Sequence, residues 1–328
     1  MGKEFSSTNA QIYKLKGRGL IINSRTQAKR VLQKENYYNL INGYKDLFLD
    51  NTYRGVDEKY LKNTNFDEIY ALYMFDRKLR NIFLMYILEI ENNLKSVLAH
   101  DFSKKYGHDN YLKIDNFDIT VKAWEKNKTA SQKVGDVADL IAGIQREISN
   151  QLRKNNSMIS HHILQYGYIP LWVLINSLSL GTVSIFYSYL KQKDQNDIGR
   201  VLKIKPDEMN NLLSVLTIYR NACAHDERLY CLKAIKKNGK PNSIKTNWIH
   251  TKLAIPLDST NNPVNGKNDL YAIIIIFKLM LKKNSFHEFY IELSKTIESL
   301  DKRLKTITIS AVLKVMGFPV NWKDIKSI

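Results

Sequence analysis

The strongest constraint on the fold is the stretch from Asn65 to Lys105, which has the pattern of one long helix. Its apolar side chains recur at intervals of three and four, the spacing of one face of an α-helix. They are Leu79, Phe83, Tyr86, Ile90, Leu94, Val97 and Leu98. Asn65 and Glu68 have the spacing of a capping box, and lysines precede Gly107 at the other end. The sequence therefore predicts a single helix over about 65–105.

The rest of the chain also has helical patterns. Only six prolines occur, and strand-turn-strand patterns with Asn-Gly turns at regular spacing are missing. Helices are predicted over 136–154, 170–191, 206–225, 268–283 and 285–300, with a last short one ending at 317. Ser285 and Glu288 have capping-box spacing at the start of one of them. The apolar run Tyr271–Leu281 is too short to cross a bilayer and predicts a buried helix or strand. Together these patterns predict an all-α fold.

The chain is long enough for one large or two ordinary domains, with 328 residues of which 44% are hydrophobic. We expect a helical N-terminal region over residues 1–64 and a helical core over 65–328. A basic insertion at about 228–257 interrupts that core, because the stretch breaks the helical pattern and holds six lysines without an acidic residue.

The charge balance indicates a polyanionic partner. Fifty lysines and arginines against 32 acidic residues give a formal net charge of +18. Nucleic acid is the commonest partner of such a surface, anionic membrane is the second, and a soluble basic protein without a polyanion is the simplest alternative.

Cysteine and histidine usage indicate no metal site. The two cysteines, Cys223 and Cys231, argue against a disulfide framework and fit a reducing cytoplasm. The histidines form no metal-ligand pattern with carboxylates, and the first nineteen residues lack the apolar core of a signal peptide. We therefore expect a cytoplasmic protein with no metal, no cofactor and no membrane association.

One short motif concentrates polar residues at the end of the helix predicted over 206–225. It holds Arg220, Asn221 and His225. One stripe of this helix is apolar and a second is polar but uncharged, with Asn210, Ser214, Thr217, Asn221 and His225. A solvent-facing stripe usually carries Lys and Glu, so a neutral stripe is more typical of a helix that faces another helix, a partner subunit or a site. No acidic residue lies three or four positions from Arg220, so no ion pair within the helix accounts for it.

These three residue types suit cleavage of RNA without a metal ion. His225 titrates near neutral pH and can move the proton of a ribose 2′-OH or of the leaving 5′-oxygen. Arg220 can stabilise charge on the phosphorane-like transition state, and Asn221 can orient the histidine or bind a phosphate oxygen. One histidine cannot easily act as both base and acid, so two copies of the motif facing each other in a homodimer are expected. The alternative is an ordinary helix end, where His225 favours the dipole and Arg220 is solvated. The local pattern leaves both interpretations open.

The motif Arg-Asn-x-x-x-His at the end of an apolar helix resembles the catalytic motif of HEPN-superfamily ribonucleases. Several separate stretches, in order, also resemble the Abi-like proteins of the AbiD/AbiF type from bacterial abortive-infection systems. These are LQKENYYNLINGYKDLF, FDRKLRNIFLMYILEIENNLKSVLAH, PLWVLINSLSLGTVSIFYSYL and VMGFPVNWK. The resemblance covers most of the chain.

This resemblance implies a HEPN-type helical bundle and a metal-independent endoribonuclease that assembles as a homodimer. It implies a growth-arresting toxin in antiphage defence. By the same resemblance, Arg220 would bind phosphate, Asn221 would orient the site and His225 would transfer the proton. Some such proteins bind a structured noncoding RNA encoded beside them, so a noncoding RNA is an expected partner. Asn176 stands where an acidic residue is expected, which puts the support of the site in question.

Two alternatives come from other classes of protein. The first is a non-catalytic RNA-binding protein that keeps the HEPN fold and the basic surface. The second is a regulator that acts through protein contacts, for which the basic charge would be incidental.

Charged residues also lie among the apolar ones of the predicted long helix. Asp76 and Arg80 form a favourable i,i+4 pair. The simpler interpretation is an ion-pair network that supports the core. The alternative is that Arg80 or Glu91 borders the catalytic cleft and supports its residues.

Two basic segments are candidates for contact with RNA. The N-terminal segment has Lys14, Lys16, Arg18, Arg25, Lys29 and Arg30, followed by Tyr37 and Tyr38. The two tyrosines could stack on unpaired bases. The segment within 228–257 has Lys236, Lys237, Lys240 and Lys245. Lysines without interleaved base-reading groups indicate phosphate contact, although either segment could be an ordinary solvated face.

Overall fold

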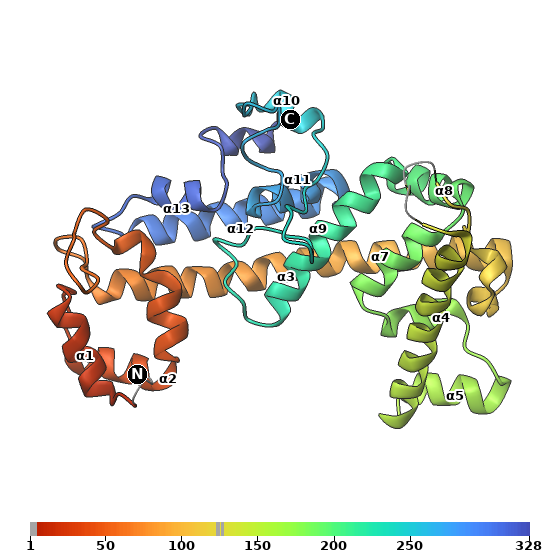
Figure 1. Ribbon diagram of the computed structural model, residues 1–328, viewed down its shortest axis with the longest axis horizontal. Coiled ribbons are helices and arrows are strands. Elements are labelled where there is room, and N and C mark those ends of the chain that lie inside the picture. The colour runs from red at the N-terminus through yellow and green to blue at the C-terminus, as the bar shows by residue number, and fades with distance from the viewer. Residues whose placement is uncertain (1–4, 123–124, 126–127) are drawn as a thin grey trace.

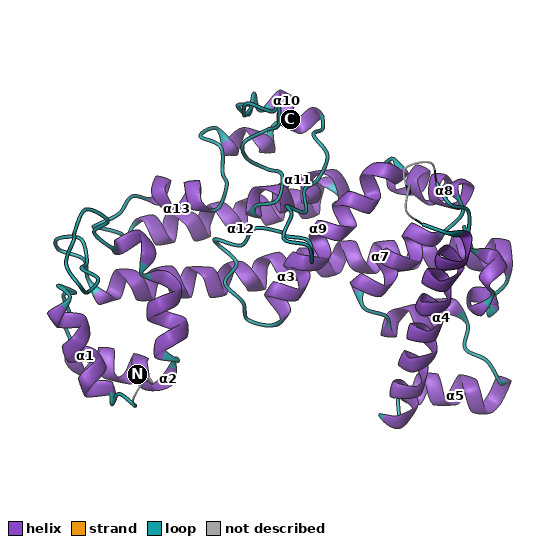
Figure 2. Ribbon diagram, in the orientation of Figure 1, coloured by secondary structure: helices purple, strands orange, loops and turns teal. Residues whose placement is uncertain are grey.

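Helices are the regular secondary structure of the part of the chain that the structure describes, which is residues 5–122, 125 and 128–328 of a computed structural model. Figure 2 shows helices joined by loops and turns. Within those residues no strand occurs, and extended segments meet only at isolated bridges such as the one between Ile21 and Asn65. The prediction of an all-α fold is confirmed.

The bounds of the helices follow. The α-helices are α1 (Thr8–Gly17), α2 (Arg25–Lys34), α3 (Phe66–Tyr106), α4 (Ala130–Arg153), α5 (Ser157–Tyr166), α6 (Leu171–Leu174), α7 (Leu180–Tyr189), α8 (Gln192–Leu202), α9 (Pro206–Ala224), α10 (Trp248–Lys252), α11 (Leu270–Met280), α12 (Lys283–Asp301) and α13 (Ile309–Val315). The short helical turns are η1 (Tyr38–Asn42), η2 (Asp46–Phe48), η3 (Asn110–Leu112), η4 (Ile114–Asn116), η5 (Ile175–Ser177) and η6 (Trp322–Lys326).

Helix α3 is the axis of the molecule. It has 41 residues, about 60 Å at 1.5 Å per residue, and runs through the middle of the molecule in Figure 1. The predicted capping box is present, since Asn65 Oδ1 accepts a bond from Asp67 N at 2.9 Å and Glu68 Oε1 accepts one from Asn65 N at 3.4 Å. Gly107 follows the last turn with a φ of +92°, a left-handed conformation that favours glycine. Local signals therefore determine both ends of this helix.

Other helices cover α3 along its whole length. Helices α6, α8, α9 and α12 pack against it, and α11 and α12 lie along one side with α13 beyond them (Figure 1). Helix α11 is buried from Leu270 to Phe277, so the apolar run there forms a core helix. Phe277 meets Phe83 and Tyr86 of α3 and Phe289 of α12 in one aromatic cluster. In the described residues no helix combines the length and the apolar character needed to cross a membrane.

The two ends of α3 carry different structures. Helices α1 and α2 lie at its N-terminal end, and α4 and α5 at its C-terminal end (Figure 1). Leu40, Ile41 and Phe48 of the N-terminal region are fully buried in the common core. The division of the chain at residue 64 stays a prediction.

Three local predictions need correction. The helix predicted over 170–191 is interrupted, because the chain turns at Leu178 and Ser179 caps a new helix by accepting a bond from Thr182 N. The predicted capping box at Ser285 is absent, since α12 begins earlier and Ser285 instead donates to Glu89 of α3. The stretch 228–257, predicted to break the helical pattern, contains the short helix α10, and its Ile244 and Ile249 are buried.

Candidate active site

The motif residues occupy the exposed end of α9. The apolar stripe of this helix is buried as predicted, with Met209, Leu212, Leu216 and Tyr219 fully buried and Cys223 nearly so. The hydroxyl of Tyr219 donates to Leu232 O at 2.7 Å, which ties the helix to the chain that follows it. On the opposite side Ser214, Asn221 and His225 are exposed. The polar stripe therefore ends in an asparagine and a histidine that are open to solvent.

The helix ends at the histidine itself. His225 N donates to Asn221 O at 2.9 Å, and Asp226 then adopts a φ of +58°, which turns the chain away from the helix axis. His225 is thus the residue that caps the C-terminal end of α9. Its exposure leaves the ring accessible to a substrate.

Arg220 has a carboxylate partner that its own helix does not supply. Its Nε lies 3.5 Å from Glu91 Oε2 of α3, and the arginine side chain is 28% exposed while Glu91 is buried. No partner comes from α9 itself, in keeping with its sequence, and the carboxylate belongs to a helix distant in the chain. The contact is an ion pair without a hydrogen bond, since both of these buried atoms lack a hydrogen-bond partner within the described chain.

Glu91 is held from its other side. Lys95 Nζ lies 2.7 Å from Glu91 Oε1, and the lysine side chain is 7% exposed. The carboxylate therefore has one oxygen engaged by an adjacent turn of α3 and the other directed to Arg220. Lys95 was not among the predicted site residues, although its i,i+4 spacing from Glu91 was a signal in the sequence.

The predicted pair of Asp76 and Arg80 is present and reaches the chain just after His225. Asp76 Oδ2 accepts a bond from Arg80 Nη1 at 2.9 Å, and Arg80 Nη2 lies 2.5 Å from Asp226 Oδ1. Asp76 also accepts the backbone N–H groups of Leu229 at 3.0 Å and Tyr230 at 2.7 Å. The pair therefore holds the segment that follows the motif.

Burial is the main cause of the pKa shifts of two groups near the motif, the Asp76 carboxyl and the Cys223 thiol. It raises the pKa of the Asp76 carboxyl, whereas the hydroxyl of Tyr44 and the charge of Arg80 oppose that shift. Burial also raises the pKa of the Cys223 thiol to about 12, so this cysteine is a protonated core residue at neutral pH and not a nucleophile.

A cleft of about 630 Å³ opens beside the motif. It is lined by Tyr38 and Asn42 of η1, by Arg80, and by the residues from Asp226 onward. Tyr38 is 65% exposed, and Arg228 Nη1 donates to Gly43 O at 3.0 Å across the cleft. The structure thus brings one of the tyrosines predicted to stack on bases next to the chain that follows His225.

The predicted N-terminal RNA-contacting residues differ in availability. Lys14, Lys16, Lys29 and Arg30 are exposed. Arg25 is also exposed and its guanidinium lies 5.0 Å from the Tyr13 ring. Arg18 is only 12% exposed and pairs with Asp57 at 2.8 Å and Glu58 at 2.9 Å. A phosphate would have to compete with two carboxylates for Arg18, and Tyr37 is half-buried.

The basic residues after the motif are mostly free to meet a ligand. Lys236, Lys237 and Lys240 are exposed at a turn. Lys245 is exposed too, but its Nζ lies 2.7 Å from Asp207 of α9.

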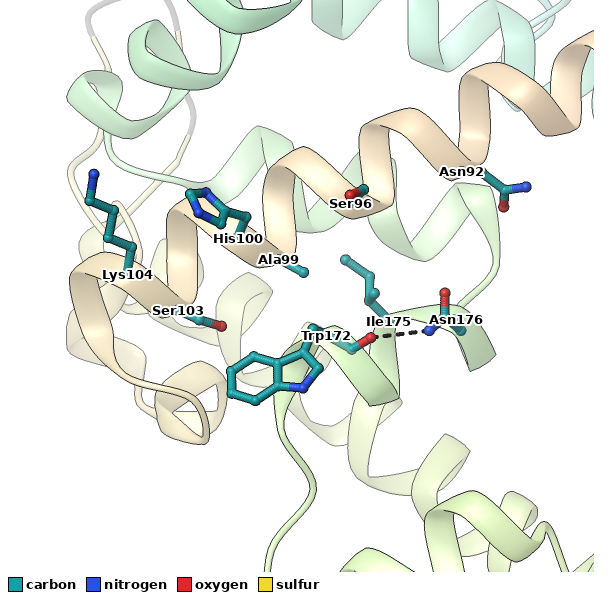
Figure 3. Close-up of a pocket in the computed structure, with 9 residues that line it drawn as sticks. All are labelled: Asn92, Ser96, Ala99, His100, Ser103, Lys104, Trp172, Ile175 and Asn176. Atoms are coloured by element: carbon teal, nitrogen blue, oxygen red, sulfur yellow. Dashed lines mark hydrogen bonds between the residues drawn. The ribbon is translucent and has the colours of Figure 1, made fainter.

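Asn176 does not contact the motif through its hydrogen bonds. Its Nδ2 donates to Trp172 O at 3.1 Å and to Val173 O at 3.4 Å, and its side chain lines a cavity between α3 and α6 (Figure 3). The sequence patterns did not predict a cavity at this position. Within the described residues no group of three or more His, Cys, Asp or Glu side chains is arranged to hold a metal ion.

Comparison with known proteins gives a match to one family model. The model, described as Abi-like protein, matches residues 30–231, which is more than half of the chain. No curated protein and no solved structure matches this chain. The matched residues run from α2 through α3 to the segment just beyond His225, and so include the motif and both carboxylates that hold it. This chain belongs to the Abi-like protein family.

Proposed function

We propose that this protein is a metal-independent endoribonuclease of the HEPN type and the AbiD/AbiF group, and that it acts in the cytoplasm as a toxin of abortive infection. The observation that carries the proposal is the placement of Arg220, Asn221 and His225 together at the exposed end of α9. Buried acidic residues of α3 hold this end from both sides, Glu91 at the arginine and Asp76 at the chain beyond the histidine.

The chemistry assigned to the motif is intramolecular transesterification. His225 removes the proton from a ribose 2′-OH, the 2′-oxygen forms a bond to phosphorus, and the bond to the 5′-oxygen breaks. The leaving oxygen takes a proton from a second acid, and the products are a 2′,3′-cyclic phosphate and a 5′-hydroxyl. Arg220 stabilises the charge on the phosphoryl oxygens, for which it must exchange the Glu91 carboxylate for the phosphate. Asn221 orients the histidine or a phosphate oxygen.

The second acid is proposed to be His225 of another copy of this chain. The exposed Ser214, Asn221 and His225 form a neutral face on α9 that suits contact with an identical helix. A homodimer would place two motifs opposite each other. A strictly monomeric yet active enzyme would contradict this part of the proposal.

RNA is the proposed partner, both as substrate and as a structured noncoding RNA. The exposed Lys14, Lys16, Lys29 and Arg30 and the exposed lysines of 236–240 support phosphate contact, as does the net charge of +18. The Glu91 contact with Arg220 favours one alternative, a non-catalytic RNA-binding protein in which the arginine is a structural residue.

The test is cleavage of total RNA in excess chelator by wild type, Arg220→Ala and His225→Ala. Both substitutions are expected to lower the rate at least about 100-fold, because each removes a group that acts in the transition state. Arg200→Ala and His287→Ala are the matched controls, since Arg200 is 79% exposed and His287 is exposed on α12, both outside the motif.

Mass spectrometry of the products is expected to find cyclic-phosphate ends. Equal cleavage by all five proteins would overturn the assignment of the motif. RNA binding without cleavage by wild type would favour the non-catalytic alternative.

A further inference from the structure

A cavity of about 650 Å³ lies between the C-terminal half of α3 and the short helix α6 (Figure 3). It is lined from α3 by Asn92, Ser96, Ala99, His100, Ser103 and Lys104, and from the other side by Trp172, Ile175 and Asn176. All nine lining residues are neutral or basic. Asn92 directly follows Glu91, the carboxylate that contacts Arg220, and its side chain points about 100° further round the helix, into the cavity instead of toward the arginine.

Trp172 supplies an aromatic surface to this cavity. Its side chain is 53% exposed although Leu171, Val173 and Leu174 around it are buried. The short helix is thus anchored by its neighbours while the indole stays open. An exposed ring on a rigid element is the usual platform for stacking of an unpaired base, because every base has a π-face.

The polar side chains of the cavity suit the edge of a base. Asn92, Ser96 and Asn176 carry amide and hydroxyl groups that both donate and accept hydrogen bonds. The Nδ2 of Asn176 is engaged by two carbonyls of α6, which leaves its Oδ1 directed toward α3 in Figure 3. Lys104 and His100 lie farther along α3, where a phosphate would be favoured, although His100 Nδ1 is also 3.1 Å from Asp101.

Further aromatic rings continue from Trp172 along the surface. Measured between ring centroids, His108 lies 6.4 Å from Trp172 and 4.6 Å from Tyr168, and Tyr166 lies 6.4 Å from Tyr168. His161 and His162 of α5 each lie 5.8 Å from Tyr166, which is 56% exposed. A single strand with one base in the cavity would meet further aromatic rings along this series, of which Tyr166 and His161 are exposed.

We propose that this cavity binds an unpaired nucleobase, with Trp172 stacking on its face and Asn92 and Asn176 bonding to its edge. The inference rests on the proposed function only in taking RNA as the ligand. It adds a preference for single-stranded over paired RNA, because a base within a duplex cannot present its face to Trp172. A free nucleotide has the same chemistry, and the experiment separates the two sources.

The experiment measures binding of a fluorescein-labelled 12-nucleotide single strand by anisotropy, in the His225→Ala background so that the RNA stays intact. Trp172→Ala is expected to weaken binding at least about fivefold, since stacking of one base contributes that much or more. Trp172→Phe retains an aromatic face and is expected to stay within about twofold of the parent. Binding of a duplex of the same sequence is expected to be unchanged by either substitution.

A second pair of variants, one of them a matched control, tests the polar side chains that line the cavity. Asn92→Asp places a negative charge in the cavity, whereas Asn93→Asp places the same charge on the next position of α3, which is also exposed but does not line the cavity. Only the first is expected to weaken single-strand binding, again at least about fivefold. Equal losses of affinity in both variants would mean that only the overall charge matters, and would overturn the inference. Unchanged binding by Trp172→Ala would overturn it too.

Competition with adenosine monophosphate shows whether the bound base belongs to an RNA strand or to a free nucleotide. Displacement of the labelled strand at low millimolar concentration would show that the cavity accepts a free nucleotide, and displacement only by unlabelled strand would assign it to RNA. The outcome is separable from the ribonuclease proposal. If the protein cleaves RNA but its binding does not depend on Trp172, only the assignment of the cavity is overturned. If binding depends on Trp172 but no cleavage occurs, only the assignment of the active site is overturned.

Discussion

Helix α3 carries two buried ion pairs with the same spacing, Asp76 with Arg80 and Glu91 with Lys95. They differ in how many hydrogen bonds the carboxylate accepts. Both carboxylates are buried and each has its lysine or arginine four residues later. The oxygens of Asp76 accept four bonds, from Tyr44, Arg80 and two backbone N–H groups. Glu91 Oε2 has no hydrogen-bond donor within the described chain and faces Arg220 at 3.5 Å.

The difference separates a structural pair from one that can change partners. A buried carboxylate with all its lone pairs engaged is expensive to disturb, because each donor it leaves behind is also buried. An oxygen that makes only a long ionic contact can lose that contact at smaller cost. The first pair therefore holds the chain after His225 in place, and the second leaves Arg220 available to a phosphate.

The largest expected effect is on folding. Asp76→Ala should lower the free energy of unfolding by about 3–5 kcal/mol, because it leaves the buried Arg80 and two backbone N–H groups without their acceptor. Glu91→Ala is the comparison variant and should cost less, about 3 kcal/mol, since it leaves the buried Lys95 without its partner but breaks no hydrogen bond to the backbone or at Arg220. Urea unfolding followed by circular dichroism measures both values. Equal losses would erase the distinction between the two pairs.

A smaller effect is expected on RNA affinity. Glu91→Gln removes the charge that competes with phosphate for Arg220, and should tighten RNA binding about two- to fivefold. Glu89→Gln is the control, because it makes the same change of net charge two residues away at an exposed position of α3. Binding is measured in the His225→Ala background at two salt concentrations. Equal tightening by both variants would attribute the effect to net charge alone.

A pH-dependent effect of similar size comes from a third buried carboxylate. Arg77 of α3 bonds to Glu35 with both Nη atoms, at 3.1 and 2.8 Å, and lowers the pKa of that carboxyl. A carboxyl whose pKa is lower in the folded state contributes stability above its ordinary pKa of about 4.3, and that stability is lost as the pH falls through the folded value. Glu35→Gln should therefore cost about 1 kcal/mol at pH 7, and its difference from wild type should shrink as the pH falls below the ordinary pKa of the carboxyl.

Urea unfolding of both proteins from pH 3 to pH 7 measures this difference. A constant gap across the range would show that Arg77 does not hold Glu35 in its charged form.

Sequence patterns alone determined the elements whose ends depend on nearby residues. Helix α3 starts at the predicted capping box of Asn65 and Glu68 and ends before Gly107, and α9 starts at Pro206 with its apolar stripe buried as expected. Two local predictions failed for different reasons. Ser285 donates to Glu89 of a distant helix instead of capping α12. Ser179 caps a new helix through a bond from Thr182 N, a local signal that the prediction of a continuous helix overlooked.

The candidate site divides in the same way. The identity and spacing of Arg220, Asn221 and His225, and the pairing of Asp76 with Arg80, were legible in the sequence because each depends on one helix and its period. The contact of Arg220 with Glu91, the bonds from Asp76 to the chain after His225 and the cavity at Trp172 join segments far apart in the chain. Only tertiary structure decided these, because helical periodicity specifies which face is buried but not which side chain of another helix it will meet.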